Sequence, residues 1–211
     1  MPDRLSRRLL LAVGLLGILL GGQGQLSGQQ RLQQPNGTGP GETRPNETGL
    51  RPVWLDLPFV AQTPDGCGSA SLAMVMRYWQ REQHLPMTAE AGPLQQKLFS
   101  RSAHGIPASR MVSALQQAGF AAYVFHGQWS DLEHHLALGR PLIAAVRDGG
   151  RHGPLHYVVL AGVGSDAVYL NDPARQRLLR LSRTAFLDEW SATDDWTLLA
   201  VPRAAAPAAA R

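Results

Sequence analysis

Hydrophobic positions in the middle of the chain recur three or four residues apart, which is the spacing of a helix buried on one face. Leu72, Val75, Met76 and Trp79 form the clearest such face and predict a helix over residues 67–83. Weaker versions of this pattern predict helices over residues 89–99 and 107–119, before a strand over residues 121–126. The first half of the folded region is therefore expected to be helical.

The pattern changes in the second half, where continuous apolar runs predict strands rather than amphipathic helices. The predicted strands cover residues 141–147, 155–163, 167–171 and 196–201. Two helices interrupt them: residues 130–133 match a capping box for a helix that ends near Gly139, and Ser182 can cap a short helix through Trp190. Helices followed by an antiparallel sheet make an α+β fold.

The N-terminus has the pattern of an export signal. Arg4, Arg7 and Arg8 precede an apolar run over residues 9–20, and small residues follow it. The run is shorter than the roughly 20 residues that cross a bilayer. We therefore predict a cleaved signal over residues 1–24, with membrane contact only if it stays uncleaved, and a periplasmic or secreted bacterial protein.

The remaining boundaries follow from composition. Residues 25–52 are rich in Gln, Gly and Pro without apolar periodicity, which predicts a flexible linker. A folded domain is expected over residues 53–203, followed by a disordered Ala/Pro tail over residues 204–211. We expect this domain to be a monomer.

Charge argues against a nucleic-acid partner, although the sequence pI is about 9.8. Residues 1–52 hold six of the 20 basic and three of the 16 acidic residues, which leaves 14 basic and 13 acidic residues for the rest. A nearly neutral domain without Lys/Arg clusters has no electrostatic footprint for nucleic acid.

The single cysteine, Cys67, is the first candidate for chemistry. It stands at the start of the predicted 67–83 helix, where unpaired backbone N–H groups and the positive end of the macrodipole favour a thiolate. A lone cysteine permits no intrachain disulfide and no Cys-based zinc cage. By itself, this position favours an inert buried thiol slightly over a nucleophile.

The candidate base for such a thiol is His156, at the beginning of the 155–163 run. Taken alone, His156 is better explained as a hydrogen-bonded strand end, and Asp172 as part of a turn-forming Asp-Pro pair. The following run ends in Asp172. If the two strands pair across the 162–166 turn, six residues on each side place His156 and Asp172 together at the open end of the hairpin. A carboxylate in that place would orient the imidazole and stabilise its charged form.

Gln62, five residues before Cys67, can donate a hydrogen bond from its side-chain amide to an oxyanion, with the Cys67 N–H as second donor.

A metal site is not expected. His134 and His135 lie beside Asp131 and Glu133, but neighbouring positions on a helix do not converge on one ion.

With these residues in place, the sequence resembles the papain-like cysteine peptidases, and more closely the bacteriocin-processing, double-glycine peptidase family and its stand-alone relatives. The matching segments are residues 58–62, 67–75, 105–107, 139–143, 156–162 and 171–174, in the order of the family. The resemblance implies Cys67 as nucleophile, His156 as base, Asp172 as orienting residue and Gln62 as oxyanion donor. Two positions depart from the family, which commonly has Asp before the cysteine and Pro two residues after it, where this chain has Gly66 and Ser69.

The expected function is an exported cysteine peptidase that hydrolyses a peptide or protein substrate through a thioester, with no cofactor and no metal. Two alternatives stay open on the same residues: amidase or transpeptidase acyl transfer, and a non-catalytic peptide-binding module. Gly-Gly specificity is not carried over to this chain.

Overall fold

Seven antiparallel strands form one sheet in the part of the chain that the computed structural model describes, residues 53–203. The strands are β1 (Val53–Trp54), β2 (Phe120–His126), β3 (Leu142–Arg147), β4 (Leu155–Val163), β5 (Ala167–Asn171), β6 (Leu179–Ser182) and β7 (Trp196–Pro202). Their order is β2-β7-β3-β4-β5-β6, and β1 pairs with the C-terminal end of β4. The predicted export signal, linker and tail lie outside the described residues.

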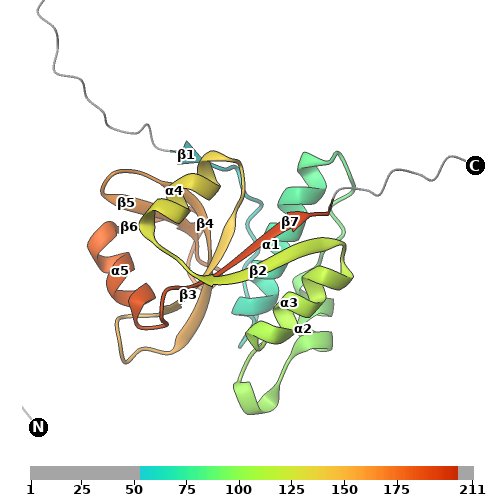
Figure 1. The fold of residues 1–211 in the computed structure, drawn as a ribbon. Helices are drawn as coiled ribbons and strands as arrows, with labels where there is room; N and C mark the ends of the chain where they lie inside the picture. The colour runs from blue at the N-terminus through green and yellow to red at the C-terminus, as the bar shows by residue number, and fades with distance from the viewer. Residues whose placement is uncertain (1–52, 204–211) are drawn as a thin grey trace, which may run out of the picture. The chain divides into compact units, whose positions relative to one another are not determined.

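Helices cover both faces of this sheet, with α1, α2 and α3 gathered on one side and α4 and α5 on the other (Figure 1). The helices are α1 (Cys67–Glu82), α2 (Ala91–Leu98), α3 (Ala108–Gln117), α4 (Trp129–Ala137) and α5 (Arg183–Ser191), with a 3₁₀ turn at Arg101–Ala103. Helices followed by an antiparallel sheet confirm the predicted α+β class.

Capping residues in the sequence predicted the start of α5 correctly and the start of α4 incorrectly. Ser182 caps α5 as expected, because its Oγ accepts a hydrogen bond from the backbone N–H of Ala185 at 3.2 Å. The capping box of α4 lies two residues earlier than predicted, since Gln128 and Asp131 form it. Glu133, the predicted partner in that box, instead accepts a hydrogen bond from the Trp129 indole at 2.8 Å. The short strand β6 was not predicted, and β1 is the beginning of a segment, residues 53–60, that the sequence predicts to be extended.

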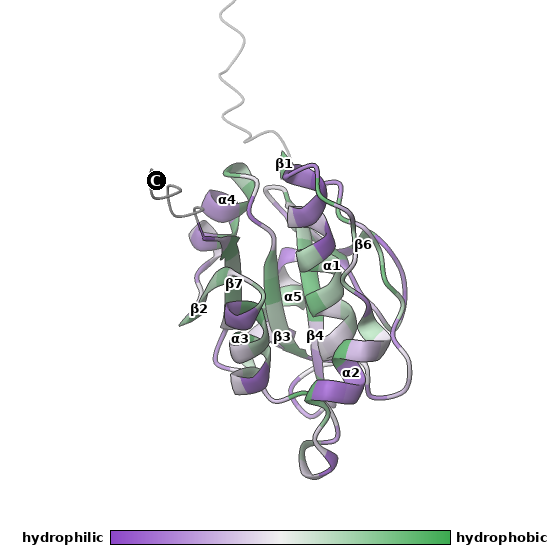
Figure 2. Cartoon of the chain, turned by 90° about the vertical axis from the view of Figure 1, so that its right-hand side faces the viewer, coloured by the Kyte–Doolittle hydropathy of each residue, from purple (hydrophilic) through white to green (hydrophobic). Residues whose placement is uncertain are grey.

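The central strands are buried on both faces because each face meets a layer of helices. Ala145 and Tyr157 pack with α1–α3, whereas their chain neighbours Val146 and Val158 pack with α4 and α5. Figure 2 shows strand β3 in the green of hydrophobic residues, while the outlying helix α2 carries purple, hydrophilic segments. Two-sided burial explains why these strands appear in the sequence as continuous apolar runs.

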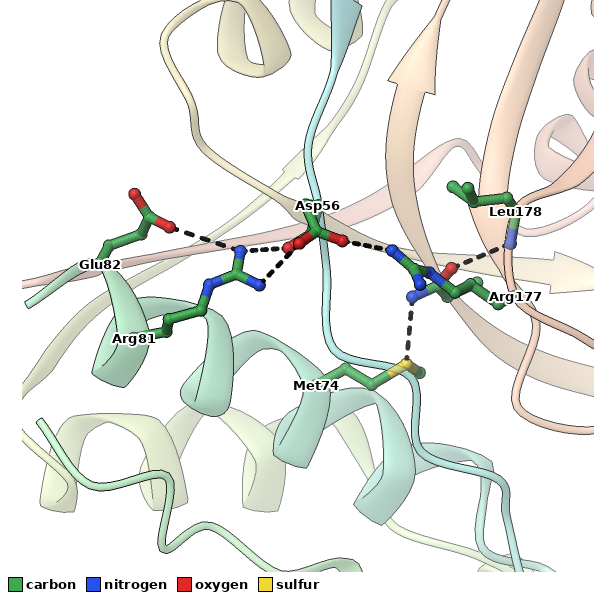
Figure 3. Close-up of polar contacts among 7 residues, drawn as sticks. Asp56, Met74, Arg81, Glu82, Arg177 and Leu178 are labelled. Atoms are coloured by element: carbon green, nitrogen blue, oxygen red, sulfur yellow. Dashed lines mark hydrogen bonds and ion pairs between the residues drawn. The ribbon is translucent and has the colours of Figure 1, made fainter. Parts of the chain in front are cut away.

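Polar contacts attach α1 to the segments on either side of it (Figure 3). The Asp56 carboxylate accepts a hydrogen bond from Arg81 of α1 at 3.0 Å and another from Arg177, which follows β5. These groups are exposed, so each pair contributes little to stability. Beneath them, the buried Asn171 side chain contacts the Met74 sulfur at 3.7 Å and accepts from the Leu178 N–H at 3.0 Å. The end of β5 is thereby held against α1.

Candidate active site

Cys67 is the first residue of α1, as the hydrophobic pattern predicted. Its neighbours leave no room for side chains: a Cβ on Gly66 would lie 2.8 Å from the Thr63 carbonyl oxygen, and one on Gly68 would lie 3.1 Å from Ile106. The first turn carries no side-chain cap, so backbone N–H groups remain to face the sulfur. The tight turn before the helix gives a physical reason for glycine at position 66, where the family commonly has Asp.

His156 and Asp172 come together at the end of the β4–β5 hairpin. His156 Nε2 lies 2.8 Å from Asp172 Oδ1, and both side chains are buried. The predicted meeting is confirmed, but the predicted even register is wrong. A bulge between Leu160 and Gly162 shifts the strands, so that Val159 pairs with Asn171. His156 and Asp172 therefore lie beyond the last paired residues, and their side chains cross the remaining gap.

The Asp172 carboxylate has two further partners. Its Oδ1 accepts a hydrogen bond from the Ala174 N–H at 2.9 Å, and its Oδ2 lies 3.6 Å from Arg175 Nε. Arg175 in turn pairs with Asp148, in the loop between β3 and β4. Burial raises the pKa of the Asp172 carboxyl, but the bond to His156 and the other partners outweigh burial and lower it below 3.8. Asp172 is thus a carboxylate at neutral pH.

Cys67 and His156 shift one another's pKa values in opposite directions. Burial raises the pKa of the Cys67 thiol, but hydrogen bonds with the His156 side chain and with the backbone of Tyr157 and Gly68 lower it below the usual 9.0. Burial lowers the pKa of His156, but hydrogen bonds with Asp172 and Cys67 raise it to about 9. Because Nε2 faces Asp172, Nδ1 is the ring nitrogen left for the sulfur. Both shifts favour a thiolate beside an imidazolium at neutral pH.

Tyr157 connects α1 to β4 and was not identified from the sequence. Strand β5 pairs with β4 only from Val159 onward, and α1 lies beside the preceding part of β4. There the backbone of Tyr157 bonds to Cys67, and its carbonyl accepts a hydrogen bond from Ser71 Oγ at 3.3 Å. The spacing of four residues between Cys67 and Ser71 was the only available signal, since it places both on one helix face.

The backbone of Gln62 holds this residue beside the end of β5, where Asp172 lies. Its N–H donates to the carbonyl of Pro173 at 2.9 Å, directly after Asp172, and its side-chain Oε1 is buried without a hydrogen-bond partner among the described residues. This oxygen is a hydrogen-bond acceptor, so it does not supply the donor that an oxyanion needs, and that donor would be the NH2 group of the same side chain. The structure therefore brings all four predicted residues to one end of β4. The oxyanion role of Gln62 stays a prediction.

Within residues 53–203, no group of three or more His, Cys, Asp or Glu side chains could hold a metal ion. No helix in that region is long and apolar enough to cross a membrane.

The model of the Peptidase_C39 like family matches this chain over residues 54–197. A search of curated proteins found no match.

Several solved structures share the fold. The peptidase domain of Streptococcus ComA, a bifunctional ABC transporter, is 22% identical, covers 69% of this chain and 98% of its own, and gives a TM-score of 0.55. A C39-like peptidase from Bacillus anthracis is 20% identical, covers 74% and 100%, and gives 0.57. A double glycine motif protease from an AMS/PCAT transporter, in complex with the leader peptide, is 22% identical, covers 73% of this chain and 99% of its own, and gives a TM-score of 0.54. At these identities the likeness shows the fold alone.

Proposed function

This chain belongs to the Peptidase_C39 like family, and we propose that it is a cysteine peptidase with Cys67 as its nucleophile. The observation that carries the proposal is the contiguous arrangement of Cys67, His156 and Asp172. Asp172 lies 2.8 Å from one imidazole nitrogen of His156, and the same imidazole hydrogen-bonds to the thiol. A nucleophile, a base and a group that orients the base are the parts that thiol catalysis needs.

In the first half-reaction, the Cys67 thiolate attacks the carbonyl carbon of the substrate peptide bond. The developing oxyanion accepts hydrogen bonds from the Gln62 side-chain amide and the Cys67 N–H. The His156 imidazolium gives its proton to the amide nitrogen, the C–N bond breaks, and the amine product leaves. A thioester between Cys67 and the acyl part of the substrate remains.

In the second half-reaction, neutral His156 accepts a proton from water as the water oxygen attacks the thioester carbonyl. The C–S bond breaks, the acid product leaves, and the thiolate and imidazolium are restored. Asp172 stabilises the imidazolium of the free enzyme and holds the orientation of the ring in both half-reactions, while remaining ionised itself.

A peptide substrate is supported by a protein of the same fold whose structure is a complex with a leader peptide. We also propose that the protein is exported, because of the basic and apolar pattern over residues 1–24. Mass analysis of the chain recovered from periplasm and medium tests this. Recovery only from the cytoplasm at full length would contradict export.

The peptidase proposal is tested by following peptide cleavage and thiol alkylation in the wild-type chain and in Cys67→Ala. We expect cleavage to fall by about 10⁶-fold in the variant, which is the scale measured for loss of a catalytic nucleophile. Because Cys67 is the only cysteine, iodoacetamide adds one label, and this label should form faster at pH 6 in the folded chain than in the denatured chain.

The control is Ser191→Ala, at the partly buried C-terminal end of α5. It should cleave and label like the wild type. A native thiol that is no more reactive than the denatured one, or full biological effect in Cys67→Ala, would contradict the proposal. In the second case a peptide-binding module is the better explanation. Amide products formed with an added amine would instead favour transpeptidation.

A further inference from the structure

Arg175 connects the buried carboxylate of the candidate active site to a second, more exposed aspartate. The Oδ1 atom of Asp172 is used by His156, at 2.8 Å, and by the Ala174 N–H, at 2.9 Å. Its Oδ2 atom has one ion-pair partner among residues 53–203, the Nε of Arg175 at 3.6 Å. The same guanidinium pairs with Asp148, in the loop between β3 and β4. Arg175 thus joins two carboxylates, and the Asp172 side chain is only 4% exposed, against 31% for Asp148.

A tight turn after β5 brings Arg175 back to Asp172. The Asp172 N–H donates to the carbonyl oxygen of Gln176 at 3.0 Å, and the Arg175 N–H donates to the carbonyl oxygen of Asp172 at 3.0 Å. Pro173 has a fixed φ within this turn. The backbone that carries Arg175 is therefore already held in place where its side chain meets the carboxylate.

Three carboxylates meet around this arginine. Asp172 and Asp148 are its ion-pair partners, and the third is Glu189 of α5. Burial is the main reason that the pKa of Glu189 is raised, and the charges of Asp148 and Asp172 add to it. A hydrogen bond with the backbone of Gly149 and the charge of Arg175 act in the opposite direction. Without the arginine, repulsion between like charges would favour another orientation of the Asp172 carboxylate.

A neighbouring arginine allows a direct comparison. Arg177 lies in the same loop, is exposed to a similar extent (49% against 44% for Arg175), and likewise pairs with a distant aspartate, Asp56 (Figure 3). Exposed pairs of this kind contribute little to stability. Of the two arginines, only Arg175 also forms an ion pair with Asp172. Its distinguishing feature is therefore its contact with the carboxylate that orients the base.

We propose that Arg175, held in place by Asp148, is a positioning residue for the candidate catalytic triad. It fixes the Oδ2 atom of Asp172, so that Oδ1 stays directed at His156. The terminal torsion of an aspartate side chain is broad, and an ion pair on one oxygen restricts it. This inference rests on the proposed peptidase function for its catalytic meaning, but the interaction of Asp172 with His156 can be measured without turnover.

Removal of Arg175 has two effects of opposite sign on His156. Loss of a nearby positive charge, by itself, favours the imidazolium and raises its pKa. Burial lowers the pKa of His156, and the bond with Asp172 is the largest of the effects that raise it to about 9. Loss of the orientation of Asp172 weakens that bond and so lowers the pKa. The direction of the change therefore distinguishes positioning from a simple charge effect.

The other charged groups that act on His156, on Asp172 or on Arg175 come from three elements, and removal of Arg175 leaves them in place. They are Cys67 of α1, Glu189 of α5 and Asp148 of the loop between β3 and β4.

The test compares Arg175→Met with the matched control Arg177→Met, since each removes one exposed charge and keeps a long unbranched side chain. Imidazole resonances are titrated by NMR in chains with labelled histidine, and the His156 signal is identified by its loss in His156→Gln. We expect the pKa of His156 to fall in Arg175→Met and to keep its wild-type value in Arg177→Met. In peptide cleavage, kcat should fall about tenfold in Arg175→Met alone with KM unchanged, because the chemical groups are misaligned while substrate contacts remain.

A second variant tests the link to Asp148, and it also tests the proposal if Arg175→Met does not fold. Asp148→Asn keeps the arginine but removes the charge that holds it, so kcat should fall in this variant as well. The double variant should have the same kcat as Arg175→Met, because Asp148 acts through the arginine. Additive losses would overturn the role of Asp148.

The outcomes separate the two proposals. If the pKa of His156 is unchanged or raised in Arg175→Met, the positioning role is wrong, and the peptidase proposal stands on cleavage by the wild-type chain. If the pKa falls as expected but the wild-type chain cleaves no peptide, the peptidase proposal is wrong and Arg175 still positions Asp172.

Discussion

The two regions that meet at Cys67 hold their functional groups in different ways. In the helical region, α1–α3, the pKa of the Cys67 thiol is lowered mainly by His156 and Tyr157 of β4, and less by the backbone of Gly68 in its own helix. In the sheet region, β3–β5 with the loop that follows β5, His156 is bonded to Asp172, and Asp172 to Ala174 and Arg175, all within that region. The base is thus organised locally, whereas the nucleophile depends on the packing of one region against the other.

Asp172→Asn breaks the sheet region's own arrangement and should have the largest effect. Loss of the carboxylate lowers the pKa of His156 from about 9, weakens the imidazolium and so raises the pKa of Cys67. We expect kcat/KM to fall by about 10² to 10⁴-fold, as in enzymes whose orienting aspartate is replaced by asparagine. Alkylation of Cys67 across a pH series should show its half-maximum at higher pH than in the wild type.

Asp166→Asn is the matched control for this substitution. Asp166 lies at the other end of the same hairpin, is exposed, and pairs only with Arg180 among the described side chains. Its loss should leave both measurements unchanged. If Asp172→Asn behaves like Asp166→Asn, the carboxylate does not support the base.

The pH profile separates the two regions in the wild-type chain. Cleavage should rise as pH passes the lowered pKa of Cys67, and fall above about 9 as His156 loses the proton that the leaving amine needs. Each limb should change by about tenfold per pH unit. Alkylation by iodoacetamide needs only the thiolate, so it should show the acid limb without the alkaline fall. An alkaline fall in both measurements, or in neither, would contradict the separate roles.

Ser71→Ala changes only the contact between the two regions and should have the smallest effect. It removes the hydrogen bond from Ser71 Oγ to the Tyr157 carbonyl, worth about 1 kcal/mol in the free energy of unfolding. Because the same segment of β4 bonds to Cys67, kcat/KM should fall several-fold and the alkylation profile should shift to higher pH.

Ser113→Ala, at an exposed position on α3, should change neither the free energy of unfolding nor the alkylation profile. A loss of stability in Ser71→Ala with an unchanged alkylation profile would show that Ser71 has only a structural role.

The sequence by itself determined the parts of this protein that depend on local patterns. Helical spacing after Cys67, apolar runs around His156 and the cap at Ser182 specified elements that the structure contains. Turn residues between two such runs also predicted the hairpin that joins His156 to Asp172. Each of these signals is a pattern of a few neighbouring residues, and such a pattern is enough to favour a helix, a strand, a cap or a turn.

Only the tertiary structure decided how these parts meet. The bulge at Leu160 and Gly162 changes the hairpin register, because extra residues in a strand depend on what packs around them. The contacts of α1 with Tyr157, 86 residues beyond Ser71, depend on a strand edge that β5 leaves uncovered. A pocket of about 180 Å³ that is lined by residues of α3, β3, β4, β7 and the segment after α5 likewise has no local signal. Distant segments create these features, and the chain order alone carries no record of their packing.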